Sequence, residues 1–216
     1  RAYLREKGLL ETHERDYAEN RYDGRRMKRT YTGASPLSEE DTHDAFIRRL
    51  FTDWVDGYSE DVPFFAWIDF VAPHPPFDAP EPYASMYDES EMPDPVAADP
   101  EQFPARLRNR IERLMKGLSE EEVQRARAGY YAMVTLLDAQ VGHMVAALER
   151  KGLLDNTLVV FVGDQGSAMG DHGLFGKGAL LKSSINSPLV MSCPARFRTD
   201  VVVDRPVEMQ DLAPTF

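Results

Sequence analysis

Two stretches of the sequence have apolar residues at the three- and four-residue spacing that indicates an amphipathic helix. The first opens at Ser38-Glu39-Glu40-Asp41, where a serine precedes acidic residues. Its apolar side is predicted to face a sheet. Its apolar positions are Ala45, Phe46, Leu50, Phe51, Trp54 and Val55. The second opens at Ser119, with Glu122 in the position of a capping box, and it stops at Lys151-Gly152. Its apolar positions are Val123, Tyr130, Val134, Leu137, Val141, Val145 and Leu148.

Three short apolar runs predict buried strands. They are Pro63–Val71, Leu158–Val162 and Ser187–Met191. The last two are interpreted as central parallel strands, because strands buried on both faces are continuously apolar rather than alternating. A strand, a long helix and further strands in succession imply an α/β sheet with right-handed crossovers.

The remaining segments are predicted to be connections. Residues 73–104 contain most of the prolines and no sustained periodicity, which indicates a long ordered loop around a site. Residues 1–60 are strongly charged and predict a surface-rich connection with short helices. The chain does not start with methionine, and residues 211–216 form a helix-opening pattern with no helix after it. Both ends are therefore expected to be cut from something longer.

Composition and charge narrow the functional classes. The chain has 216 residues, 43% hydrophobic and 28% charged, as expected of a packed domain or a large part of one. Its formal net charge of −11 repels phosphate backbones, so no nucleic-acid partner is expected. No run approaches the ~18–20 apolar residues of a membrane span, so no membrane partner is expected either. The single cysteine, Cys193, excludes an internal disulfide and a multi-cysteine metal site.

Polar groups that suit a metal follow the strand predicted at Leu158–Val162. Ligand sites in α/β sheets lie beyond the carboxyl ends of the strands, and Asp164 and Gln165 occur there between two glycines. The glycines let the backbone turn sharply, and a carboxylate beside an amide oxygen suits a hard divalent cation. A plain turn after a strand would show the same residues, so the spacing leaves both interpretations open.

Three further side chains in loops are candidates for chemistry. Lys177 is a compact point charge suited to a tetrahedral oxyanion, and it equally fits a solvated surface cation. His172 lies among glycines, where a histidine bonded to nearby backbone is the alternative. His74 is held between two prolines at the end of the Pro63–Val71 run, which suits an oriented proton donor or a residue kept for packing.

Three segments of the chain carry motifs that occur in the same order in a known protein family. They are Pro63–Phe77 continued by Pro80–Tyr83, then Tyr130–Gly142, and then Asp155–Lys177. Together they resemble the leaving-group histidine segment, the long helix, and the metal-ligand and lysine segment of type I sulfatases. The related phosphonate monoester hydrolases of the alkaline phosphatase superfamily share this pattern. The resemblance implies an α/β fold, an α/β/α sandwich with a mainly parallel central sheet.

The resemblance also implies site residues and cofactors. Asp164 and Gln165 would be two ligands of a divalent cation, usually Ca²⁺, with Mg²⁺ or Mn²⁺ as alternatives. Lys177 would hold a sulfate oxygen, and His172 would lie in the matching substrate loop. His74 would protonate or bond the leaving oxygen. The family's nucleophile is a formylglycine, made from Cys or Ser in a Cys/Ser-x-Pro-x-Arg motif.

No such motif occurs in this chain, because Cys193-Pro194-Ala195-Arg196 has the wrong spacing. Residues 1–216 are therefore interpreted as the central to C-terminal part of a sulfatase-type catalytic domain, truncated at both ends and inactive alone. The formylglycine is expected upstream of residue 1, and the expected substrate is a small sulfate ester or a sulfated glycan. Two alternatives stay open: a phosphonate or phosphate ester hydrolase of the same fold, and a non-catalytic fragment acting as a binding module. Compartment and oligomeric state do not follow from the sequence.

Overall fold

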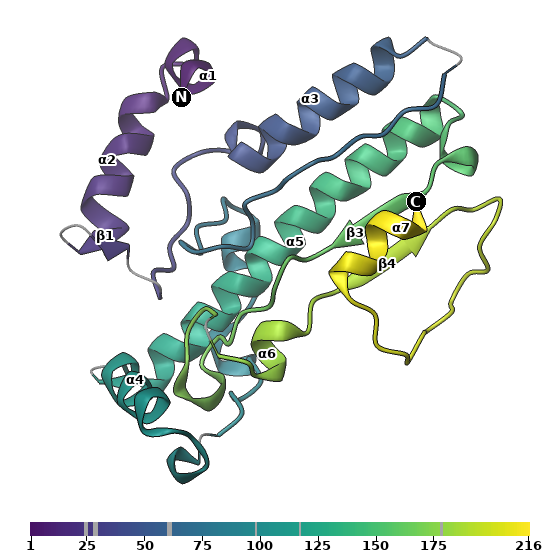
Figure 1. The fold of residues 1–216 in the computed structure, drawn as a ribbon. Helices are drawn as coiled ribbons and strands as arrows, with labels where there is room; N and C mark the ends of the chain where they lie inside the picture. The colour runs from purple at the N-terminus through teal and green to yellow at the C-terminus, as the bar shows by residue number, and fades with distance from the viewer. Residues whose placement is uncertain (24–25, 28–29, 60–61, 98, 117, 178) are drawn as a thin grey trace.

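The computed structural model describes residues 1–23, 26–27, 30–59, 62–97, 99–116, 118–177 and 179–216. Within these residues the regular structure is mainly helical, with two small two-stranded sheets (Figure 1). The helices are α1 (Ala2–Glu6), α2 (Leu10–Asn20), α3 (His43–Gly57), α4 (Ala105–Met115), α5 (Glu120–Arg150), α6 (Lys182–Ile185) and α7 (Leu212–Thr215). The strands are β1 (Tyr22–Asp23), β2 (Arg26–Met27), β3 (Val159–Val162) and β4 (Leu189–Ser192).

The long helix α5 is the central element of the fold, and both of its predicted ends are confirmed. Ser119 Oγ accepts a hydrogen bond from the Glu122 amide at 3.2 Å, and Glu122 Oε2 accepts one from the Ser119 amide at 2.8 Å. This reciprocal pair satisfies amides that a helix start otherwise leaves unpaired. At the other end, Gly152 has a φ of +68°, a conformation that glycine adopts without steric cost.

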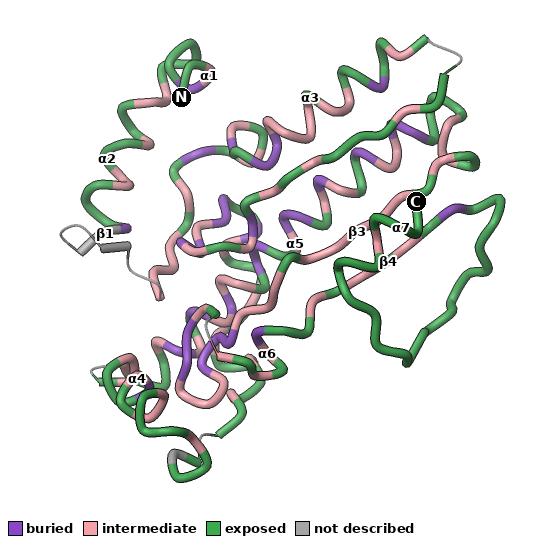
Figure 2. The backbone as a smooth tube through the Cα atoms, viewed as in Figure 1, coloured by how far each residue is buried: buried purple, intermediate pink, exposed green. Residues whose placement is uncertain are grey.

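By length and composition, α5 is also long and apolar enough to cross a membrane. The run-length argument missed this, because polar residues such as Asp138 and Gln140 interrupt the apolar positions. In the fold, 44% of that apolar stretch is buried (Figure 2). Ala132, Leu136 and Leu137 pack in one core cluster with residues of the 72–87 segment. The helix therefore has the packing of a core helix.

Helix α3 begins later than the sequence predicts. Ser38 opens only one turn of 3₁₀ helix, Glu39–Asp41, and Thr42 is the cap that starts α3, with its Oγ1 accepting from the Ala45 amide at 3.2 Å. Two capping residues in succession explain the difference, because Thr42 is extended and interrupts the helix. The apolar stripe packs on α5 as well as on a strand. Val55 of α3 shares a core cluster with Ala147 of α5 and Val159 of β3.

The prediction that the runs at 158–162 and 187–191 are parallel strands is wrong. β3 and β4 pair antiparallel, with Val160 opposite Met191 and Val162 opposite Leu189. A parallel pair needs a crossover that returns the chain to the start of the first strand. Here the connection turns back at the end of β3, where the Gly163 amide donates to the Pro188 carbonyl at 3.1 Å. Its described helices are short, the 3₁₀ turn Asp171–Gly173 and the four-residue α6.

The run Pro63–Val71 follows an extended path after α3 (Figure 1) but pairs with no strand among the described residues, so the predicted buried strand is not seen there. Phe64 packs against the cluster that joins α3 and α5, and its ring lies 5.1 Å from that of Trp54. Its neighbours Phe65 and Trp67 are 76% and 70% exposed. The apolar pattern therefore predicted the backbone conformation, while strand pairing depends on a neighbour that local sequence does not specify.

The predicted long loop at 73–104 is confirmed, with short 3₁₀ turns at Tyr83–Ser85, Glu89–Glu91 and Pro100–Gln102. It packs along α5, where the Tyr87 and Thr135 hydroxyls lie 2.6 Å apart in a hydrogen bond.

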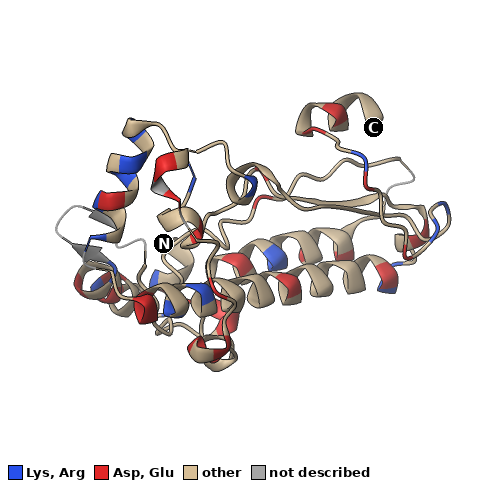
Figure 3. Ribbon diagram, turned by 90° about the horizontal axis from the view of Figure 1, so that it is seen from below, with Lys and Arg blue, Asp and Glu red and all other residues tan. Residues whose placement is uncertain are grey.

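Charged residues of both signs are interspersed along the helices (Figure 3). The segment before α7 is exposed over most of its length, as the green trace near the C-terminus shows (Figure 2).

Candidate functional site

Three of the predicted site residues line one hollow beyond the end of β3. Asp164, Gln165 and Lys177 surround a space of about 570 Å³. The rest of its wall is formed by Ala179, Leu180, Ser184 and Ile185. The antiparallel return of the chain to β4 folds the 163–188 connection over the strand end, and this brings the lysine back to the carboxylate.

The sequence around Asp164 fits this close return. The Gly166 amide donates to the Ser184 carbonyl at 2.9 Å, which ties the strand end to α6. A Cβ atom at Gly166 would lie 2.2 Å from the Ser183 carbonyl oxygen, so no other residue fits without moving the backbone. The glycine after Asp164-Gln165 is therefore required by packing, in addition to the sharp turn inferred from sequence.

Two arginines from neighbouring helices hold the loop that carries Lys177. Arg127 of α5 donates to the Met169 carbonyl at 2.8 Å and lies 3.3 Å from the Asp171 carboxylate. Arg110 of α4 donates to the Lys177 carbonyl at 2.8 Å. The backbone of Lys177 is thus fixed while its side chain is exposed to the hollow. Sequence analysis missed both arginines, because each acts on a loop far along the chain.

Asp164 and Gln165 have the chemistry of a partial cation site. Gln165 Nε2 donates to Asp164 Oδ2 at 3.0 Å, which orients the amide and leaves its carbonyl oxygen and the second carboxylate oxygen for a ligand. Calcium takes about 6–8 oxygen ligands, so two side chains fit the ion but do not complete its shell. Among the described residues no group of three or more His, Cys, Asp or Glu side chains is placed to hold a metal.

His74 is exposed in the turn that follows the extended segment and is not among the residues lining the hollow. Its amide donates to the Val71 carbonyl at 3.0 Å, and its Nδ1 lies 2.7 Å from the Pro75 carbonyl oxygen. Because a carbonyl oxygen only accepts, Nδ1 carries the proton in that bond. Nε2 is then the nitrogen available for proton transfer to or from a ligand. It accepts a hydrogen bond when the ring is neutral and donates one when the ring is charged.

His172 also lies outside the lining of the hollow. Its ring meets that of Phe103 edge-on at a centroid distance of 5.8 Å, and its amide donates to the Val96 carbonyl at 2.7 Å. It adopts a φ of +53°, which is uncommon outside glycine. These contacts tie the 166–177 loop to the 94–104 segment.

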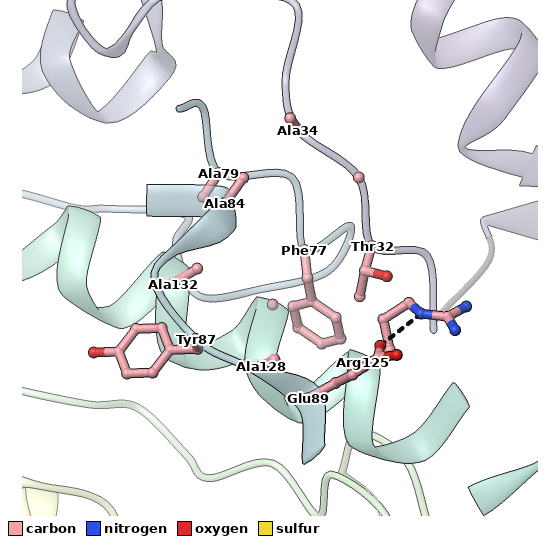
Figure 4. A pocket seen from close by; sticks show the side chains of 12 residues that line it. Thr32, Ala34, Phe77, Ala79, Ala84, Tyr87, Glu89, Arg125, Ala128 and Ala132 are labelled. Carbon is pink, nitrogen blue, oxygen red and sulfur yellow. Dashed lines mark hydrogen bonds and ion pairs between the residues drawn. The ribbon is translucent and has the colours of Figure 1, made fainter. Parts of the chain in front are cut away.

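A second, smaller hollow of about 310 Å³ lies between α5, the 32–34 segment and the 77–89 loop (Figure 4). Phe77 and small residues such as Ala128 and Ala132 form its wall. Arg125 and Glu89 form an ion pair at 2.8 Å in its lining, drawn as a dashed line in Figure 4. None of the predicted site residues lines this space.

Comparison with known proteins assigns the family. The sequence matches the Sulfatase family over residues 7–216. The chain belongs to the sulfatase family. An arylsulfatase of Clostridium perfringens is 33% identical over 177 residues, which cover 76% of this chain and 37% of that protein. The multifunctional alkaline phosphatase superfamily protein PehA of Trinickia caryophylli is 34% identical over 173 residues, 73% of this chain and 34% of that protein. This sulfatase-family chain therefore spans about a third of the length of these relatives.

Solved structures give the same fold class. The phosphonate monoester hydrolase of Agrobacterium radiobacter superposes with a TM-score of 0.75 at 30% identity, covering 88% of this chain and 40% of that one. The phosphonate monoester hydrolase of Silicibacter pomeroyi superposes with a TM-score of 0.72 at 25% identity, covering 89% and 40%. The sulfatase-family chain thus has part of an alkaline-phosphatase-like α/β fold, and the part described contains helices and two small sheets.

Proposed function

We propose that this chain is the central to C-terminal part of a sulfatase-type catalytic domain that hydrolyses sulfate esters. The observation that carries the proposal is the convergence of Asp164, Gln165 and Lys177 on one hollow at the end of β3. A carboxylate, an amide oxygen and an ammonium group there suit a divalent cation and a tetrahedral oxyanion together. Membership of the sulfatase family and the relatives named arylsulfatase support the same assignment.

In this proposal Lys177 binds an oxygen of the transferred group, while Asp164 and Gln165 hold the cation. Calcium is the expected ion, and magnesium and manganese are the alternatives. A bound cation would neutralise charge that builds on that oxygen during transfer. The formylglycine nucleophile and the remaining ligands come from a segment outside these 216 residues, so the chain alone is expected to be inactive.

His74 is the proposed proton donor to the leaving oxygen. Its Nδ1 is held by the Pro75 carbonyl, so Nε2 would carry the transferred proton. His172 belongs to the loop that presents Lys177, and its proposed role is contact with substrate from that loop. The substrate class is a small sulfate ester or a sulfated glycan, which agrees with relatives named choline-sulfatase and iduronate 2-sulfatase.

A second candidate function is hydrolysis of phosphonate or phosphate monoesters. The two phosphonate monoester hydrolases with TM-scores of 0.75 and 0.72 favour it. Lys177 and a cation would bind any tetrahedral oxyanion, so the residues of this hollow serve either substrate. A comparison of turnover on matched aryl sulfates, phosphates and phosphonates by the complete protein separates the two candidates.

The test of the site is Asp164→Ala in the complete protein that carries this chain. Loss of a cation ligand should lower turnover by about 100-fold or more, with the fold retained. Asp53→Ala is the matched control, because Asp53 is an exposed carboxylate on α3. It should leave turnover unchanged. Near-normal turnover by the Asp164 variant would show that this residue is not part of the site. After the metal has been removed with a chelator, added calcium should restore the turnover of the wild type but not that of the variant.

A further inference from the structure

A buried arginine lies next to the segment that carries His74. Arg21, at the end of α2, is 1% exposed. Its Nε donates to Asp16 Oδ2 at 2.6 Å, and its Nη1 donates to the carboxylate of Asp78. The guanidinium carbon also lies 4.2 Å from the ring centroid of Tyr17. Sequence analysis did not predict this cluster, because Arg21 falls in a charged stretch predicted to be a surface connection.

Stability alone is a poor explanation for this cluster. Removing charges from water costs several kcal/mol per ion, so a buried ion pair is often no more stabilising than apolar residues of similar volume. What such a pair does supply is a fixed geometry, since the planar guanidinium bonds carboxylates in defined directions. The cluster joins α2 to Asp78, which is 57 positions further along the chain.

Asp78 is rigidly connected to His74. Between them lie Pro75 and Pro76, whose rings fix the backbone φ. Phe77 and Ala79, on either side of Asp78, are 3% and 2% exposed. The Phe77 amide donates to the Tyr31 carbonyl at 3.1 Å, and Ala79 accepts from the Ser35 amide at 3.0 Å. The carboxylate that Arg21 bonds therefore belongs to a short, tightly packed stretch of backbone that begins at His74.

A second buried carboxylate holds the other end of the same segment. Asp44, in the first turn of α3, is 6% exposed. The backbone amides of Val71 and Ala72 act to lower the pKa of its carboxyl, which places Asp44 beside the start of this segment. The turn containing His74 thus lies between two buried charged groups, Asp44 before it and the Arg21–Asp78 pair after it.

We propose that Arg21 is a positioning residue for His74, acting through Asp78, so that the N-terminal part of this chain controls protonation of the leaving group. The proposal rests on the proposed role of His74 as proton donor. A misplacement of about 1 Å in a catalytic group costs up to about 100-fold in rate. Losing Arg21 should therefore matter only where the leaving oxygen needs the proton.

The experiment compares Arg21→Met with the wild type in the complete protein, on a series of aryl and alkyl esters whose leaving groups differ in pKa. Turnover of activated nitrophenyl esters should change by less than about twofold, and turnover of esters with poor leaving groups should fall by about 10- to 100-fold. Arg21→Lys should lose less, because an ammonium still pairs with one carboxylate but cannot bond both in a fork. Arg150→Met is the matched control, since Arg150 lies in an exposed pair with Asp56 at 3.7 Å. It should match the wild type on every ester.

His74→Ala, measured in parallel, separates the two proposals. If His74→Ala shows the dependence on leaving group and Arg21→Met does not, the positioning role is wrong while the role of His74 stands. If His74→Ala shows no such dependence, the proton-donor role itself fails. If Arg21→Met does not fold, Asp78→Asn, which keeps the shape of the side chain, is judged by the same criterion. A uniform loss on all esters in any folded variant would overturn the proposal.

Discussion

Replacing Gly129 with alanine tests how tightly the N-terminal segment packs on α5. Gly129 faces Thr32 and Phe77, and a Cβ atom there would lie 2.9 Å from Thr32 Cγ2 and 3.0 Å from Phe77 Cβ. Thr32 Cγ2 can move only by rotation about χ1, and Phe77 Cβ is bonded directly to the backbone, so relief of the second contact requires one segment to move. The same helix supplies the control, because a Cβ at Gly142 meets nothing within 4 Å.

Two opposing effects set the expected change in the free energy of unfolding. Alanine is favoured over glycine inside a helix by about 1 kcal/mol, and this gain applies at both positions. Overpacking a close contact costs about 1–3 kcal/mol, and this cost applies only at Gly129. Gly142→Ala should therefore stabilise by about 1 kcal/mol, whereas Gly129→Ala should lie between no change and about 2 kcal/mol of destabilisation.

Urea unfolding of the complete protein, followed by circular dichroism, measures both variants under one condition. The decisive quantity is the difference between them, about 1–3 kcal/mol, because the helix-propensity gain cancels. If Gly129→Ala is stabilised as much as Gly142→Ala, the contact with Thr32 and Phe77 is not as close as described. Thr32 and Phe77 also form an isolated parallel β-bridge close to the His74 turn, and a stabilised variant would contradict that pairing as well.

Two further predictions concern the site and its supports. His74→Ala should lower turnover of esters with poor leaving groups far more than turnover of activated esters. Lys177→Ala should lower turnover of both kinds of ester alike, because in the proposed site the lysine binds the transferred group. Steady-state kinetics that gave the two variants the same dependence on the leaving group would contradict the assigned roles. Burial raises the pKa of Asp44 above the ordinary aspartate value of 3.8, although His43 and the backbone amides of Val71 and Ala72 oppose this. A raised pKa means that the native state binds the proton more tightly, so the free energy of unfolding falls as pH rises from about 3.8 through the folded pKa. Urea titrations should show Asp44→Asn gaining stability relative to the wild type as pH rises through that window, and a constant difference would contradict the burial of a titrating carboxyl.

The elements that were predictable are those fixed by neighbouring residues. The capping box at Ser119 and the glycine stop at Gly152 are local interactions, and α5 begins and ends where they indicate. The start of α3 was misplaced because Ser38 and Thr42 are both good caps and local pattern does not choose between them. The direction of β4 was wrong because an apolar run specifies burial but not which strand lies beside it, nor in which sense.

The residues of the candidate site and its supports also fall into two groups, those that local sequence predicts and those that it does not. Asp164 and Gln165 were proposed because they follow a strand, and Lys177 because it lies among glycines and matches a family pattern; the structure brings the three to one hollow. Arg21 and Asp44 were missed because charged residues in a polar stretch are expected at the surface. Both are buried, and the groups that bury them come from distant segments. Supports of this kind become visible only when the contacts are known.

The residues of the hollow also explain why similarity alone does not choose between sulfate and phosphonate. In the proposed site Lys177 offers a single positive point charge, which would bind a tetrahedral oxyanion without regard to its central atom. Asp164 and Gln165 act on the cation rather than on the substrate in the proposed site. These groups are compatible with both the arylsulfatase at 33% identity and the phosphonate monoester hydrolase at 30%. Selectivity must then come from groups that contact the ester alcohol or sense the total charge of the anion. Exchanging side chains of the hollow should therefore scale both activities together, whereas a change that alters their ratio locates the selecting group.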